Sequence, residues 1–171
     1  VVPGTPQPVA GAIPVAPTVP DAPGAVPERS AAPESASAVQ VETDVLRLVV
    51  DGGSVLRAEL LDYPQTRDEG SAPVVLFDAS PADYYTAQSG WVSAGGAAPN
   101  HEQGFVPAGP ERSFALAPGQ DELVVPFVWH GPDGLEIRRS YVLRAGQYAV
   151  TVRDEIVNQG SQPWQGHAYR Q

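Results

Sequence analysis

The fold is decided by residues 122–157, which read ELVVPFVWHGPDGLEIRRSYVLRAGQYAVTVRDEIV. Residues 123–129 are all apolar, apolar and polar residues alternate over 135–138 and 150–153, and these runs are separated by Gly131-Pro132-Asp133-Gly134 and by Arg144-Ala145-Gly146-Gln147. A period of two is typical of strands with one buried face, and glycine with proline or a polar residue is typical of turns. Because the connections are short, the pattern predicts consecutive antiparallel strands over 122–129, 135–143 and 148–157.

The same pattern extends toward the N-terminus. Residues 39–45 alternate as a half-buried strand does, and the run continues through 46–50. The turn sequence Asp51-Gly52-Gly53-Ser54 then predicts a hairpin whose second strand covers 55–60. The short apolar run 74–77 is consistent with a buried strand.

Other segments complete an all-β assignment. A further strand is expected over 163–169, after a turn at 158–160, whereas the Gly-, Ala- and Pro-rich segment 88–110 is expected to be an irregular surface loop. Pro126 inside a strand indicates an edge position or a bulge. Since no segment has helical periodicity, the predicted fold is an antiparallel β-sandwich.

The chain divides near residue 39. Residues 1–38 contain nine of the 19 prolines and no aromatic residue. Such a segment buries too little apolar area to offset its ordering entropy, so we expect 1–38 to be a disordered Pro/Ala-rich tether. A proline-rich ligand for a partner domain is the alternative interpretation. Residues 39–171 are long enough for one sandwich domain.

Composition excludes several classes of function. The formal net charge is −10, and all ten basic residues are arginines without a basic cluster, which argues against nucleic-acid binding. The absence of cysteine excludes disulfides, thiolate nucleophiles and cysteine-ligated metals. No apolar window is long enough for a transmembrane helix.

A search for catalytic and cofactor motifs finds none. His101, His130 and His167 are too far apart in sequence to form a recognisable metal motif, and no nucleophile elbow or phosphate-binding loop is present. We therefore expect no catalytic residues, no metal and no cofactor. Trp91 and Trp129 are candidate contacts in a cleft, where their rings would stack on sugars or apolar peptide side chains; core packing is the alternative for both.

Four blocks of residues, in order over about 41–171, resemble the large periplasmic domain of the YidC-type membrane protein insertases. They are Thr43-Asp44-Val45-Leu46 with Gly52-Gly53 and Leu60-Leu61-Asp62-Tyr63-Pro64; Tyr85 with Ala87-Gln88-Ser89-Gly90; Gly119-Gln120-Asp121-Glu122-Leu123-Val124-Val125-Pro126; and Tyr141-Val142-Leu143-Arg144-Ala145-Gly146-Gln147-Tyr148-Ala149-Val150 leading to Asn158 and Gly160.

The resemblance implies a β-supersandwich similar to the galactose mutarotase folds, on the periplasmic side of the inner membrane of Gram-negative bacteria. It implies a non-catalytic part of a multi-pass insertase and chaperone for membrane proteins. The implied partners are the Sec translocon accessory proteins, SecDF in particular, and nascent membrane proteins. The family domain extends beyond the equivalent of Gln171, so we expect 39–171 to be incomplete at its C-terminus. An uncovered edge would then favour self-association.

Two alternatives from other classes stay open. A carbohydrate-binding or mutarotase-like sandwich would suit the predicted fold, although a mutarotase needs a histidine and a carboxylate placed across the sugar. A chaperone-like module that holds unfolded segments is the third hypothesis. Specific binding of simple sugars would support the carbohydrate hypothesis, and binding of unfolded peptides would support the chaperone hypothesis.

Overall fold

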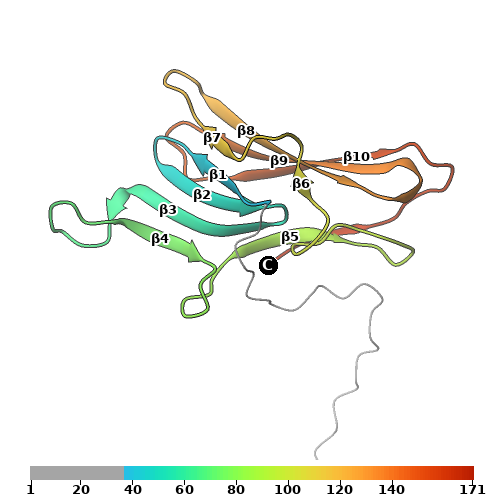
Figure 1. The fold of residues 1–171 in the computed structure, drawn as a ribbon, viewed down its shortest axis with the longest axis horizontal. Helices are drawn as coiled ribbons and strands as arrows, with labels where there is room; N and C mark the ends of the chain where they lie inside the picture. Colours follow the sequence, from blue (N-terminus) through green and yellow to red (C-terminus); the bar gives the residue numbers. More distant parts are fainter. Residues whose placement is uncertain (1–36) are drawn as a thin grey trace, which may run out of the picture.

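The computed structural model describes residues 37–171, which form two β-sheets packed face to face (Figure 1). The predicted all-β sandwich is thereby confirmed. The tether predicted over 1–38 falls almost entirely on residues 1–36, which lie outside the described residues, so this domain boundary stays a prediction. Within 37–171, no helix has the length and apolar character needed to cross a bilayer.

The larger sheet has seven strands in the order β11-β5-β3-β2-β1-β7, and β4 pairs with β3 beside this path. Its strands are β1 (Val39–Glu42), β2 (Leu46–Asp51), β3 (Ser54–Pro64), β4 (Pro73–Asp78), β5 (Ala87–Val92), β7 (Ser113–Ala115) and β11 (His167–Arg170). All pairs are antiparallel except β1 with β7, which is parallel.

The smaller sheet has four antiparallel strands in the order β10-β9-β8-β6. Its strands are β6 (Val106–Pro107), β8 (Glu122–His130), β9 (Leu135–Arg144) and β10 (Thr151–Asn158), with one 3-10 turn, η1 (Pro132–Gly134), between β8 and β9. The predicted strands at 122–129, 135–143 and 148–157 are therefore confirmed, with the last one starting three residues later.

The run predicted to continue from 39–45 into 46–50 is instead a tight hairpin, with Val39 paired to Val50. Thr43 makes the turn, because its Oγ1 accepts hydrogen bonds from the amides of Val45 (3.3 Å) and Leu46 (3.0 Å). A threonine side chain that satisfies local amides competes with a continuing strand. The next hairpin, β2–β3, turns at the predicted Asp51-Gly52-Gly53-Ser54, where Gly52 has φ +54°.

The segment 88–110 is not the predicted irregular surface loop. It supplies most of β5, which pairs with β3 and β11, and the short strand β6. His101 and Phe105 are also buried, at 5% exposure each. In the sequence the glycines of this segment indicate a loop, but in the structure they allow two backbone segments to approach closely. A Cβ on Gly90, for example, would lie 2.8 Å from Asn100 Cα.

Two expectations about single strands also need correction. The strand predicted as buried at 74–77 is present as β4, but it is only partly buried, and Leu76 is 48% exposed. Pro126 lies in β8, an interior strand, opposite Ser140 without a shift of register. The carbonyl of Pro126 accepts a hydrogen bond from the amide of Ala108, just beyond the two-residue β6. In an antiparallel strand the N–H and C=O of one residue point to the same side, so the N–H that proline lacks would also face β6. The hydrogen bonds between β8 and β9 are therefore not interrupted.

The strand predicted over 163–169 is present as β11, but it starts at His167 and does not pair with β10, the strand before it. The observed strand, β11, crosses to the larger sheet, where His167 pairs with Val92 and Arg170 with Ser89. Strand β10 consequently has β9 as its one neighbour in the smaller sheet. The two sheets are thus joined at this end by β11 as well as by packing.

The core lies between the sheets. From the larger sheet it takes the inward side chains of β1, β2 and β3, and from the smaller sheet those of β8 and β9. Val39, Val50, Val125, Ile137 and Leu143 are fully buried. Alternation along each strand puts polar neighbours such as Gln40 and Arg47 on the outer faces.

Gly53 provides a test of this packing. A Cβ at Gly53 would lie 2.5 Å from both His101 Cα and Ser89 O, which are backbone atoms that cannot rotate away. We expect Gly53→Ala to lower the free energy of unfolding by about 1–3 kcal/mol, as measured by urea denaturation. Gly95→Ala is the control, since no atom lies within 4 Å of the position that its Cβ would take. Equal stability of the two variants would contradict the close approach.

Candidate functional site

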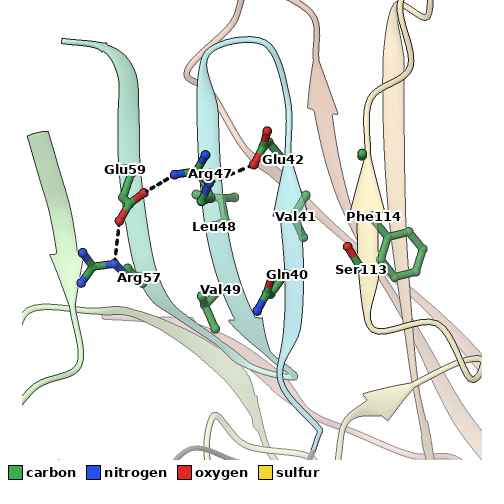
Figure 2. A pocket seen from close by; sticks show the side chains of 11 residues that line it. Gln40, Val41, Glu42, Arg47, Leu48, Val49, Arg57, Glu59, Ser113 and Phe114 are labelled. Carbon is green, nitrogen blue, oxygen red and sulfur yellow. Dashed lines mark hydrogen bonds and ion pairs between the residues drawn. The ribbon is translucent and has the colours of Figure 1, made fainter. Parts of the chain in front are cut away.

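The outer face of the larger sheet carries an open depression of ≈ 360 Å³ between β3 and β7. Outward side chains of β1, β2, β3 and β7 line it: Gln40, Glu42, Arg47, Val49, Arg57, Glu59, Ser113 and Ala115. Figure 2 shows these side chains spread across neighbouring strands. We call this surface the ladder face.

An ion-pair ladder crosses the ladder face from β1 to β4. Arg47 donates to Glu42 and to Glu59 at 2.9 Å each. Arg57 donates to Glu59 and to Asp78, also at 2.9 Å each (Figure 2 draws the Glu59 bond). Every charge of the ladder therefore has an opposite partner. The hairpins create the ladder, because their registers place Glu42, Arg47 and Glu59 directly opposite one another.

The pairing fixes the protonation states of the ladder. Burial alone would raise the pKa of Glu59, but hydrogen bonds and charge from Arg57 and Arg47 outweigh it, so the pKa lies below its ordinary value. Hydrogen bonds from Ser80, together with the charge of Arg57, lower the pKa of Asp78. The pKa of Arg47 is raised, chiefly by its hydrogen bond to Glu42. A general acid at neutral pH needs a raised carboxyl pKa, and these two carboxyl shifts have the opposite sign.

A second depression, of ≈ 510 Å³, lies on the outer face of the smaller sheet. It contains His130 on β8 and Glu136 on β9, whose Nδ1 and Oε2 atoms are 3.2 Å apart. An acid and a base that act across a sugar ring must be separated by that ring, whereas this pair is in direct contact. The arrangement therefore resembles a surface ion pair more than a mutarotase centre.

The two tryptophans singled out from the sequence lie at different depths. Trp129 is 8% exposed and belongs to the core, where its ring fills the space beside Gly104 and Gly131. Trp91 is half-buried and packs against Trp164, with ring centroids 5.6 Å apart. These positions match the alternative of core packing; a ligand contact of either ring stays a prediction.

The indole of Trp91 leads to a buried polar cluster that no pattern in the sequence indicates. Trp91 Nε1 donates to Asp154 Oδ2 at 2.8 Å. The same carboxylate accepts two bonds from Arg139, from Nε at 2.8 Å and from Nη2 at 2.7 Å. The Arg139 side chain is 1% exposed, and its Nη1 reaches Oγ and the carbonyl of Ser89 on β5. The cluster thus links β9 and β10 of one sheet to β5 of the other.

Aromatic rings close this cluster. The guanidinium carbon of Arg139 lies 4.1 Å from the ring centroid of Phe105, which is a cation–π geometry. Tyr141, next along the inner face, donates its hydroxyl to Gly52 O at 2.7 Å, and burial raises its pKa to about 12. Burial works to lower the pKa of Arg139, but the bond to Asp154 outweighs it and the pKa is raised. The Arg138-Arg139 pair was visible in the sequence, but nothing there distinguished the buried arginine from the exposed one.

His101 occupies a second buried polar position. Its Nδ1 is 2.8 Å from the hydroxyl of Tyr169 on β11, and its Nε2 is buried without a hydrogen-bond partner in the described part of the chain. His167 is exposed on β11. Across residues 37–171, no group of three or more His, Cys, Asp or Glu side chains has metal-binding geometry. The histidines therefore do not converge on one site.

Comparison with known proteins decides the family. The sequence model of the YidC periplasmic domain family matches residues 38–171. The chain belongs to the YidC periplasmic domain family. It is 49% identical over 135 residues to the membrane protein insertase YidC of Xanthomonas axonopodis pv. citri, and 50% identical over 133 residues to that of Stenotrophomonas maltophilia. These matches cover 79% and 77% of this chain, respectively, but 23% of each relative.

The YidC match confirms the family assignment made from the four sequence blocks. The YidC periplasmic domain is a non-enzymatic family, which confirms the expectation of a non-catalytic domain. It also confirms the location, because the domain is part of an inner-membrane insertase and lies on its periplasmic side. The chain spans about a quarter of the length of these relatives.

His101 makes stability depend on pH. Burial lowers the pKa of His101 in the folded domain, so the unfolded chain binds this proton more readily. Stability is therefore expected to fall as the pH drops below about 6.5, by at most about 1.4 kcal/mol per pH unit for one histidine. Urea midpoints between about pH 5.5 and 8 measure the effect. His101→Gln should flatten this dependence, and His167→Gln at an exposed position of β11 should not; identical curves for all three proteins would contradict the expectation.

Proposed function

We propose that the domain is a non-catalytic docking module of a membrane protein insertase and chaperone, which assists insertion and folding of membrane proteins. Its partners in this proposal are the Sec translocon accessory proteins, SecDF in particular, or nascent membrane proteins. The ladder face is the proposed contact surface. The family match supports the role in a membrane protein insertase. The geometry of the ladder face supports the choice of contact surface.

The paired charges of the ladder face are the observation that carries the proposal. In the ladder, Glu59 is shared by two arginines, and Arg47 and Arg57 each bridge two carboxylates. Such a surface offers polar groups and the apolar Val49 and Ala115 but no unpaired ladder charge. The surface suits a protein segment of low net charge better than a strongly charged substrate. A strongly charged substrate would find no unpaired ladder charge to bind, whereas a segment of low net charge can dock without removing water from an unpaired charge.

Site-specific photo-crosslinking in the full-length insertase tests the surface. A photoreactive phenylalanine analogue in place of Val49 should crosslink to SecDF or to a nascent membrane protein, since Val49 lies in the depression. The control position is Val128, which lines the depression on the opposite face of the sandwich. Absence of crosslinks at Val49, or equal crosslinking at both positions, would contradict the proposed surface.

Carbohydrate binding is the second candidate, and the open depression around His130 and Glu136 is what favours it. Titration of the domain with simple sugars, followed by tryptophan fluorescence, separates the two candidates. The docking proposal predicts no saturable change. A saturable change that is lost in Glu136→Gln and kept in Glu59→Gln would favour the carbohydrate candidate instead.

A further inference from the structure

His101 ties the connection between β5 and β6 to β11. The residue is 5% exposed, and its Nδ1 lies 2.8 Å from the hydroxyl of Tyr169 on β11. The same hydroxyl accepts a hydrogen bond from the backbone amide of His101 at 3.0 Å. One tyrosine oxygen therefore holds both the main chain and the side chain of His101. We call residues 99–104 the latch segment.

The hydrogen bonds at Tyr169 decide where the proton of the neutral imidazole lies. The Tyr169 oxygen accepts from the His101 amide, and its own proton is free to be donated to Nδ1. We therefore assign the imidazole proton to Nε2, which is buried without a hydrogen-bond partner in the described part of the chain. The neutral ring thus uses the tyrosine hydroxyl fully and leaves one N–H unsatisfied.

A second proton on the ring of His101 is incompatible with this arrangement. Nδ1–H would then be a donor, and the hydroxyl of Tyr169 would have to accept from it. Burial raises the pKa of Tyr169, so the hydroxyl keeps its own proton. Within residues 37–171, neither that proton nor Nε2–H would then have an acceptor. Because buried unsatisfied donors and buried charges both cost free energy, the closed contact disfavours the imidazolium.

The charged groups around His101 do not compensate for a positive ring. Glu102, the next residue in the chain, attracts an imidazolium, but Glu102 is exposed to water. Burial of His101 outweighs this attraction, so the pKa of His101 stays below its ordinary value. Arg139 on β9 acts on Tyr169 and has the same sign of charge as an imidazolium. The surroundings of the closed latch segment therefore favour the neutral ring.

The other ties of the latch segment to the sandwich are neutral hydrogen bonds. From β3, Ser54 Oγ donates to the carbonyl of His101 at 3.0 Å, and from β5, the Trp91 amide donates to the carbonyl of Pro99 at 2.8 Å. Inside the latch segment, Asn100 Oδ1 accepts from two amides of the same turn, and these bonds persist when the segment moves as a unit. Local opening therefore breaks a small number of bonds and leaves the strands paired.

We propose that residues 99–104 act as a pH-sensitive latch, which is closed on β11 while His101 is neutral and opens locally when His101 takes up a proton from solvent. In the open state the imidazolium reaches water, and β11 loses its side-chain tie to the connection between β5 and β6. The two sheets stay packed, so this opening is distinct from unfolding of the domain. Because the domain lies on the periplasmic side of the inner membrane, the latch responds to the pH of that compartment.

Proton linkage gives the direction and the size of the effect. In the open segment His101 has an ordinary pKa near 6.5, whereas in the closed segment the pKa is lower. The open state therefore binds more protons, and acid favours it. With the closed ring neutral throughout, the open fraction rises about tenfold between about pH 7.5 and 5.5.

Hydrogen–deuterium exchange of the full-length insertase in detergent micelles, followed by mass spectrometry, tests the latch. Exchange rates at about pH 7.5 and 5.5 are divided by the intrinsic rates of the unprotected amides at each pH, so that the ratio reports opening. Peptides that contain residues 99–104 should show a rise of up to about tenfold in acid, and peptides from β9 should show none. Equal rises in both sets of peptides would indicate unfolding of the whole domain and would overturn the proposal, as would no rise in residues 99–104.

Three variants assign the effect to the contact between His101 and Tyr169. His101→Gln removes the titrating group and should abolish the rise, whereas His167→Gln, at an exposed position on the same strand as Tyr169, should keep it. Tyr169→Phe should increase opening already at about pH 7.5, because the amide and Nδ1 of His101 both lose their partner. A rise that survives His101→Gln, or wild-type protection in Tyr169→Phe, would contradict the latch. The comparison of peptides within the wild type needs no variant and decides the matter where a variant fails to fold.

Discussion

The buried ion pair between Arg139 and Asp154 is the interaction on which the sandwich depends. Arg139 is 1% exposed and Asp154 12%, so both groups have lost most of their water and must satisfy each other. The bidentate geometry achieves this, and the remaining donors of Arg139 reach Ser89 on the opposite sheet. A misplaced β5 would leave a charged group buried without partners, which costs several kcal/mol. We infer that the pair fixes how the two sheets lie on one another.

The Arg139–Asp154 pair also explains why the segment 88–110 is ordered although it is rich in glycine, alanine and proline. Ser89 and Trp91 contact the ion pair from β5, and Phe105 stacks on the guanidinium. Glycines at positions 53 and 90 let the backbones around them approach closely enough for these contacts. A segment with few large apolar residues therefore becomes ordered, because polar and aromatic groups at the inter-sheet cluster hold it in place.

Strand alternation and turn composition were enough to predict most of the fold. The strands β8, β9 and β10 and the hairpin β2–β3 follow from these local patterns, and so does the sandwich class. The turn at Thr43, the order of β5 and the crossing of β11 to the larger sheet did not follow. These features depend on one side-chain hydrogen bond, on the buried Arg139 and on pairing between residues far apart in sequence. Local periodicity carries no information about such partners.

The ladder face was likewise hidden from sequence reasoning, although its members are ordinary charged residues. Glu42, Arg47 and Glu59 become neighbours through the registers of two hairpins, one of which was not predicted. The inter-sheet ion pair and the ladder thus have different roles. The buried pair organises the interior, and the exposed ladder provides a surface of balanced charge, since exposed pairs contribute little stability.

A double-mutant cycle on the buried pair tests the central claim most directly. The free energies of unfolding of the wild type, Arg139→Met, Asp154→Leu and the double variant are measured by urea denaturation. We expect each single variant to lose about 3–5 kcal/mol, because one charge is left buried and unpaired. The double variant should lose clearly less than the sum of the two. Additive losses, or single losses below about 1 kcal/mol, would contradict the claim that this pair holds the two sheets in place.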